Sequence, residues 1–179
     1  WPAPQVIFDQ INHWWRKNSQ DGRACLVFGY SLGKIQRLLS GLDSSIGPIY
    51  LHGSAVKLVQ YYRDFGIRLP PTSYVAEMDD NMDWAGSMVL APPSTIGSTW
   101  AKKFGDSATA MVSGWMLLRG TRRRQPVDRG FVLSDHADWS ELKKAIHATE
   151  ASTIWVTHGY TTALTRYLTE EGLQARALA

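Results

Sequence analysis

The sequence predicts an α/β fold with a mainly parallel sheet, and three features of the chain support this prediction. Short apolar runs alternate with segments of helical periodicity, giving about six strand candidates. Turn residues, glycine above all, separate most of these runs from the helix that follows. Polar residues follow the ends of several runs, which is where α/β folds place their chemistry. This alternation is typical of a Rossmann-like layer, in which helices cover a parallel sheet.

The composition is that of an ordinary globular chain, with 44% hydrophobic and 20% charged residues. No apolar run approaches the roughly 20 residues needed to span a membrane, and no signal peptide is visible. The single cysteine, Cys25, excludes a disulfide within the chain and favours a reducing, cytoplasmic location. We expect Cys25 to be a core residue, because no neighbour in sequence would activate its thiol.

The first two thirds of the chain predict a helix followed by strands and further helices. Residues 6–17 place Ile7, Ile11, Trp14 and Trp15 on one face of an amphipathic helix. His52 follows an apolar run, and we expect it to be a surface or capping residue. The expected elements are strands in 24–28, 48–53, 87–93 and 108–115 and helices in 34–40 and 55–65.

A glycine turn, 29–33, joins the strand in 24–28 to the helix that starts at Lys34. This order offers backbone N–H groups to an anion at a helix N-terminus, and Lys34 and Arg37 strengthen the attraction. The turn is neither a Walker loop nor a dinucleotide fingerprint, so it indicates phosphate binding only in combination with other signals.

The net charge of +3 is small, but the arginines are concentrated. Five of them lie within eleven residues, 119–129, directly before a polar cluster. A solvated loop is the plainer interpretation of such a run. Guanidinium groups leading into a candidate site favour an anionic substrate, and phosphate is the obvious anion. The five are Arg119, Arg122, Arg123, Arg124 and Arg129.

Two consecutive strand–helix units each place a histidine after a strand. The apolar run 130–133 ends in a polar cluster around His136, and a helix begins near Trp139. The run 153–156 ends at His158, and the next helix covers 161–171. Neighbouring parallel strands lie about 4.8 Å apart, so on adjacent strands the two imidazoles would converge on one site.

Four segments resemble the β-CASP branch of the metallo-β-lactamase nucleases: 28–39 (Phe-Gly-Tyr-Ser-Leu-Gly-Lys-Ile-Gln-Arg-Leu-Leu), 111–114, 133–139 (Leu-Ser-Asp-His-Ala-Asp-Trp) and 156–159 (Val-Thr-His-Gly). The likeness covers nearly the whole chain. It is strongest to bacterial exonucleases that are associated with ATP-dependent DNA ligases and related to messenger-RNA 3′-end processing factors. It implies a Rossmann-like β-CASP domain in 1–130 and the C-terminal strand–helix units of a metallo-β-lactamase fold in 131–179. The N-terminal part of that fold would precede Trp1.

The resemblance also implies roles for individual residues. His158 matches the last histidine motif, which ligates one of two zinc ions, and His136 matches a general acid near the leaving oxygen. Asp135 and Asp138 are expected to orient neighbouring histidines or to cap helices. The residues expected to bind nucleic acid are Ser31, Gly33, Lys34, Arg37, Ser113, Gly114, Arg119, Arg122, Arg123 and Arg124.

The chain departs from this family in lacking the His-x-His-x-Asp-His signature that supplies most of the metal ligands. One histidine does not hold two zinc ions, so we expect the chain to be inactive by itself. The resemblance thus implies part of a zinc-dependent phosphodiesterase, a DNA exonuclease acting in DNA repair. The alternatives are an RNA 3′-end processing nuclease and a non-catalytic nucleic-acid-binding module. Expected partners are nucleic acid, DNA before RNA, an ATP-dependent DNA ligase and a helicase, with no membrane.

Overall fold

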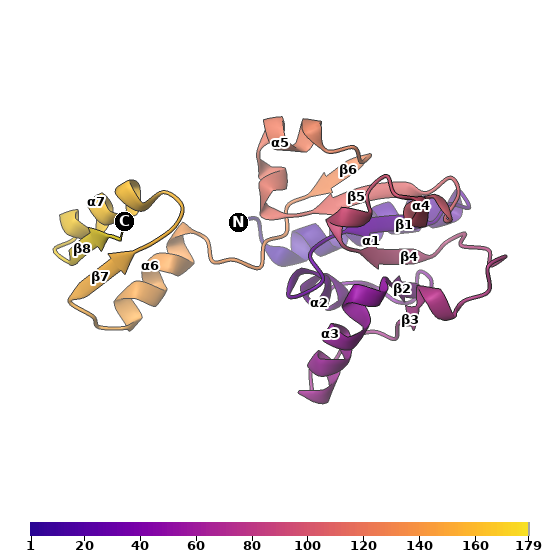
Figure 1. The fold of residues 1–179 in the computed structure, drawn as a ribbon, viewed down its shortest axis with the longest axis horizontal. Helices are drawn as coiled ribbons and strands as arrows, with labels where there is room; N and C mark the ends of the chain where they lie inside the picture. Colours follow the sequence, from indigo (N-terminus) through magenta and orange to yellow (C-terminus); the bar gives the residue numbers. More distant parts are fainter. Residues whose placement is uncertain (179) are drawn as a thin grey trace. The chain divides into compact units, whose positions relative to one another are not determined.

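A computed structural model describes residues 1–178 and divides into two compact units, Trp1–His136 and the remainder from Ala137 (Figure 1). The first unit contains a six-stranded sheet and the second a two-stranded sheet. The sequence predicts the boundary between residues 130 and 131. The structural division falls later because β6 (Arg129–Phe131) pairs with a strand of the first sheet. None of the described helices is long and apolar enough to cross a bilayer.

The sheet of the first unit is parallel throughout, with the order β3-β2-β4-β1-β5-β6. The predicted α/β fold with a mainly parallel sheet is therefore confirmed at this level. Its strands before β6 are β1 Cys25–Phe28, β2 Ile49–Leu51, β3 Ser73–Tyr74, β4 Met88–Ala91 and β5 Ala108–Val112. Its helices are α1 Pro4–Gln20, α2 Lys34–Leu39, α3 Gly53–Asp64, α4 Thr99–Lys102 and α5 Arg119–Arg124. Three short 3₁₀ helices are η1 Val75–Glu77, η2 Pro93–Thr95 and η3 Gly114–Leu117.

Both faces of this sheet are covered, which explains why β1 and β4 are apolar and buried at every position. One face, with Val27 and Leu90, packs against α1, α2 and α3. The opposite face, with Leu26, packs against Trp84 and Phe104. Alternate residues of each strand therefore belong to different cores, because side chains alternate across a strand.

Helix α1 contributes the four side chains predicted for its apolar face, and all of them are buried. The Trp15 indole N–H donates to the Gly86 carbonyl at 3.0 Å, so the buried ring leaves no unpaired donor. Cys25 is also buried as expected, and burial raises the pKa of its thiol to about 12. His52 caps α3, because its Nδ1 accepts the Ser54 amide at 3.1 Å.

The second unit packs two helices with two parallel strands. Asp138 begins α6 with a capping box: its carboxylate accepts the Glu141 amide at 2.9 Å, and the Glu141 carboxylate accepts the Asp138 amide at 3.0 Å. The capping role predicted as one option for Asp138 is therefore confirmed. Between the helices, Trp139 meets Tyr167 edge to face at 5.0 Å. The elements are α6 Trp139–Ala148, β7 Thr153–Val156, α7 Thr161–Glu170 and β8 Gln174–Ala177.

The expectation that His136 and His158 follow adjacent strands is wrong. The strand before His136 is β6, which pairs with β5 at the edge of the first sheet. The strand before His158 is β7, which pairs with β8 in the second sheet. Strands β3 and β8 were not predicted from sequence, since β3 has two residues and β8 contains no β-branched or aromatic side chain.

Candidate nucleic-acid interface

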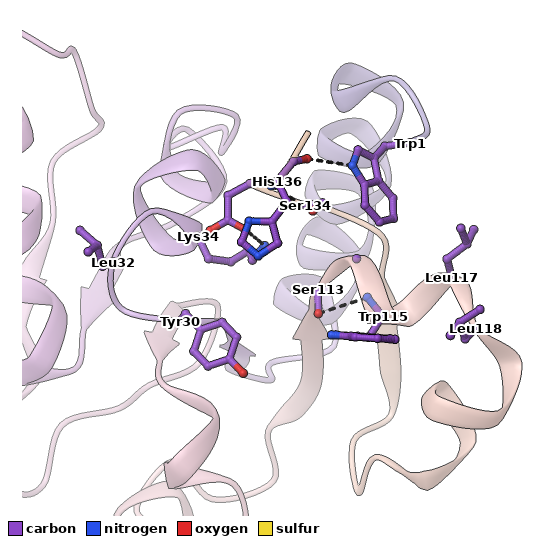
Figure 2. Close-up of a pocket in the computed structure, with 12 residues that line it drawn as sticks. Trp1, Tyr30, Leu32, Lys34, Ser113, Trp115, Leu117, Leu118, Ser134 and His136 are labelled. Atoms are coloured by element: carbon purple, nitrogen blue, oxygen red, sulfur yellow. Dashed lines mark hydrogen bonds and ion pairs between the residues drawn. The ribbon is translucent and has the colours of Figure 1, made fainter. Parts of the chain in front are cut away.

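A cavity of about 570 Å³ opens at the carboxyl edge of the sheet in the first unit (Figure 2). Its walls come from the segments that follow β1, β5 and β6. The chain leaves β1 towards β2 on one side, whereas β5 and β6 lie on the other. A reversal of this kind is a topological switch point, and open α/β sheets bind their ligands in the crevice outside it.

Lys34 lies in the wall of this cavity but is only 3% exposed. Its ammonium group donates to the Asp135 carboxylate in an ion pair. Partial burial by itself would raise the pKa of Asp135, but the hydrogen bond and positive charge of Lys34 hold that pKa below its usual value. The charge of Lys34 is therefore neutralised by another residue of the chain.

Backbone amides at the glycine turn before α2 also have hydrogen-bond partners within the chain. The amide of Lys34 donates to the Leu32 carbonyl at 3.0 Å, and that of Ile35 donates to the Tyr30 carbonyl at 3.2 Å. A Cβ atom on Gly33 would lie 3.0 Å from Asp135 Oδ2. Lys34 and Gly33 thus lie against an internal carboxylate, and the expectation that they hold a phosphate does not fit this arrangement.

The two other predicted residues of this segment differ from each other. The Ser31 hydroxyl is hydrogen-bonded to the Ser54 hydroxyl at 2.7 Å, which links the turn to α3. Arg37 is half-buried and lines a neighbouring hollow together with Gly33 and Asp135. Unlike Lys34, Arg37 forms no ion pair with a carboxylate of the described residues.

His136 borders the same cavity and has an 86% exposed side chain. Its backbone is held on both sides: the amide donates to Ser134 Oγ at 3.2 Å, and the carbonyl accepts the Trp1 indole N–H at 2.9 Å. Asp135 Oδ1 lies 3.9 Å from His136 Nδ1, which is too far for a hydrogen bond. A held backbone with an exposed imidazole places an acid–base group at the cavity.

Ser113 and Gly114 follow β5 and also border the cavity. Ser113 is 5% exposed, and its hydroxyl caps η3 by accepting the Trp115 amide at 3.3 Å. A Cβ atom on Gly114 would lie 3.2 Å from Ser134 Oγ, so glycine allows the segment after β6 to approach. These two residues shape the cavity, and Ser113 already uses its hydroxyl within the turn.

The arginine cluster forms the short helix α5 and not the loop considered from sequence. All four arginines of α5 are exposed. None of them forms an ion pair with another residue of the described chain. Arg129 differs, since its guanidinium lies 4.9 Å from the centre of the Phe131 ring. Helix α5 directly follows Leu117 and Leu118 in the cavity wall, so exposed positive charge continues from the cavity.

His158 belongs to the second unit and follows β7. Its backbone is left-handed, with φ +64°, and its Nδ1 lies 2.8 Å from the Thr157 hydroxyl. If Nδ1 donates to that hydroxyl, Nε2 keeps the lone pair that a metal requires. Within residues 1–178, however, no three His, Cys, Asp or Glu side chains gather as a metal site. Structural zinc takes four ligands, so these residues do not fit a zinc site by themselves.

Several cavity residues were missed from sequence, chiefly Tyr30 and Trp115. Both are large aromatic residues, and they are 63% and 62% exposed. Each directly follows a glycine within two residues of the end of a strand, in Gly29-Tyr30 after β1 and Gly114-Trp115 after β5. An aromatic side chain just beyond the end of a buried strand cannot pack in the core. This position is the sequence feature that could have identified Tyr30 and Trp115.

No protein-family model matches the chain. The chain is 35% identical over 177 residues to a "Probable DNA ligase" of Opitutus terrae. The match covers 99% of the chain but only 17% of that protein. The similarity therefore includes both structural units, while the name refers to a much longer protein, most of which lies outside the match.

Proposed function

We propose that the chain is the nucleic-acid-binding part of a longer zinc-dependent phosphodiesterase of the β-CASP branch, and that its substrate is DNA. The observation that carries the proposal is the cavity at the switch point, which an exposed imidazole borders and whose wall at Leu117 and Leu118 leads along the chain into a helix of exposed arginines. The similarity to a protein named as a DNA ligase favours DNA over RNA. Within this proposal the longer enzyme acts as an exonuclease in DNA repair.

The arginines of α5 bind the phosphate backbone in this proposal. Guanidinium groups form paired hydrogen bonds to phosphate oxygens, and the α5 arginines have no internal carboxylate to compete with the ligand in the described chain. Lys34 differs because Asp135 already holds its ammonium group. Phosphate binding at the exposed helix would bring a strand alongside the cavity that His136 borders.

His136 delivers a proton to the leaving oxygen of the cleaved phosphodiester. Histidine exchanges protons readily near neutral pH, and its exposed ring is available to a bound strand. His158 is one ligand of the zinc centre, whose other ligands the enzyme must supply from outside the described residues. The described chain by itself therefore binds nucleic acid and does not cleave it.

The binding part is tested with the 179-residue chain and a fluorescent DNA strand, using anisotropy over a series of salt concentrations. Changing Arg122, Arg123 and Arg124 to alanine should weaken binding and reduce the slope of log affinity against log salt. Each lost phosphate contact reduces that slope by about 0.7 for a single strand and about 0.9 for a duplex. An RNA strand of the same sequence should bind more weakly than DNA.

A second triple variant separates local contacts from net charge. Lys57, Arg68 and Lys102 are exposed cations on other segments of the first unit, and their replacement by alanine removes the same charge. This control should change the slope much less than the α5 variant. Equal effects of the two triples would contradict α5 as the binding element.

The catalytic part is tested in the full-length protein that contains this chain. His136→Ala should slow cleavage by roughly 10²- to 10⁴-fold while zinc content stays unchanged. His158→Ala should lower zinc content as well as turnover, since the site loses a ligand. His13→Ala, an exposed histidine on α1, is the matched control and should alter neither. Loss of zinc in His136→Ala would instead make His136 a ligand.

A further inference from the structure

We propose that Tyr30 and Trp115 form a stacking subsite for an unpaired nucleobase, so that the strand presented to His136 is single-stranded. This inference rests on the proposed nucleic-acid function and specifies its substrate class. It concerns the aromatic residues in the walls of the cavity, whereas the preceding proposal used His136 and the arginines of α5.

The exposure of the two rings sets them apart from the tryptophans packed in the core. Trp14 and Trp15 of α1 are 7% and 0% exposed, because they pack in the core between that helix and the sheet. Tyr30 and Trp115 are more than half exposed although they border a cavity. Aromatic surface of this kind within a concave site provides a place for a planar, partly apolar ligand.

The topology brings the two rings to the same cavity. Strands β1 and β5 are parallel neighbours, with Phe28 opposite Met111. Tyr30 follows Phe28 by two residues, and Trp115 lies in η3 just beyond β5. Figure 2 shows the two rings at different walls of the cavity, with His136 bordering the same space. A volume of about 570 Å³ accommodates a ligand of nucleotide size.

The charges around the cavity decide between possible occupants. Exposed apolar side chains, Leu117 and Leu118, lead directly into α5, whose arginines are exposed. Sites for single-stranded nucleic acid combine a cationic surface for the backbone with aromatic rings on which the bases stack. The arginines of α5 and the rings of Tyr30 and Trp115 provide these two features. An apolar protein segment would use the rings but would leave the adjoining positive charge without a partner.

The geometry of the subsite also favours a single strand over a duplex. In a duplex the bases are stacked on their neighbours and paired, and extracting one costs a few kcal/mol. In a single strand the bases are already unpaired and stack on side-chain rings at little further cost. Stacking is tolerant of sequence, because every base has a π face, so little base preference is expected.

The test uses the 179-residue chain with three fluorescent ligands of equal length: a thymidine oligonucleotide, a duplex and an abasic deoxyribose-phosphate strand. The thymidine strand should bind tightest, and the abasic strand should lose the stacking contribution. Tyr30→Leu and Trp115→Leu should each weaken binding of the thymidine strand by roughly 5- to 100-fold, the range expected for stacking of one base. The salt slope should stay unchanged, because no phosphate contact is removed.

Two further variants serve as controls. Tyr30→Phe keeps the ring and should bind nearly as well as the original chain. Phe65→Leu removes an 87% exposed ring at the end of α3 and should bind normally. Melting temperatures identify any variant that fails to fold. If a leucine variant fails, the comparison of the thymidine and abasic strands on the unaltered chain still tests the stacking contribution.

The results separate failure of this inference from failure of the proposed function. Normal binding by both leucine variants, together with weak binding by the α5 triple variant, would overturn stacking while supporting nucleic-acid binding. Equal affinity for the thymidine and abasic strands would also overturn stacking. If the chain binds none of the three ligands, both proposals are rejected together.

Discussion

Lys34 and the arginines of α5 carry the same charge and were predicted to do the same work, yet the structure places them in opposite environments. Lys34 is buried and paired with Asp135, a residue 101 positions later in the chain. The α5 arginines are exposed and have no ion-pair partner in the described residues. A positive residue in a suitable motif is available to an anionic ligand only where no internal carboxylate already pairs with it.

The two environments also predict different roles, with Lys34 contributing to the stability of the fold and the α5 arginines to ligand binding. A buried ammonium group is costly unless a carboxylate and hydrogen bonds compensate it, so Lys34 and Asp135 depend on each other. The guanidinium groups of exposed arginines stay hydrated in the folded state, so they contribute little to the free energy of folding. We therefore expect variants at Lys34 to affect unfolding and variants in α5 to affect ligand binding.

The largest effect is expected for Lys34→Met, which leaves a partly buried carboxylate without its partner. The free energy of unfolding should fall by about 2–4 kcal/mol, slightly below the range for a fully buried pair because Asp135 retains some solvent contact. Urea unfolding measures this loss. The double variant Lys34→Met, Asp135→Asn should recover part of it, since the unpaired charge is removed as well. A loss below about 0.5 kcal/mol would show that the pair does not stabilise the fold.

Gly33→Ala should have the next largest effect. Its φ of +78° is left-handed, and an added Cβ would crowd Asp135 Oδ2. Gly22 has a similar φ of +69°, and no atom lies within 4 Å of the position that an added Cβ would take, so Gly22→Ala is the matched control for backbone strain alone. We expect losses of about 2 kcal/mol at Gly33 and about 1 kcal/mol at Gly22. Equal losses at both positions would mean that Asp135 yields to the methyl group.

A smaller effect is expected on the acid side of the stability profile. The pKa of Asp135 is lowered in the folded chain, so its contribution is present above the usual carboxyl value of 3.8 and is lost as pH falls through the lowered value. Asp135→Asn should therefore show a shallower decline in the free energy of unfolding as pH falls below about 5. Urea titrations at several pH values measure both curves, and parallel curves would argue against a stabilising carboxylate.

The smallest effect on stability is expected for the triple alanine variant at Arg122, Arg123 and Arg124. These side chains are exposed, so the free energy of unfolding should change by less than about 0.5 kcal/mol. The same variant should show the reduced salt slope in DNA binding. A large loss of stability would mean that α5 packs through these residues, and the contrast with Lys34 would then fail.

The sequence by itself determined the elements whose signals are local. The buried face of α1 followed from helical spacing and the central strands from apolar runs. Capping was one of two roles that position before a helix suggested for Asp138 and His52. These features depend on neighbours within one or two turns, so a single chain segment contains the information. The parallel sheet followed from the alternation of such segments.

Tertiary structure decided the features that depend on residues distant in sequence. The edge position of β6, the pairing of β7 with β8 and the Lys34–Asp135 ion pair each join separate segments. The cavity between Tyr30 and Trp115 exists because β1 and β5 are neighbours, which no local pattern specifies. Strand order and burial select among the contacts that a sequence allows, and they decided here which cations are paired and which remain at the surface.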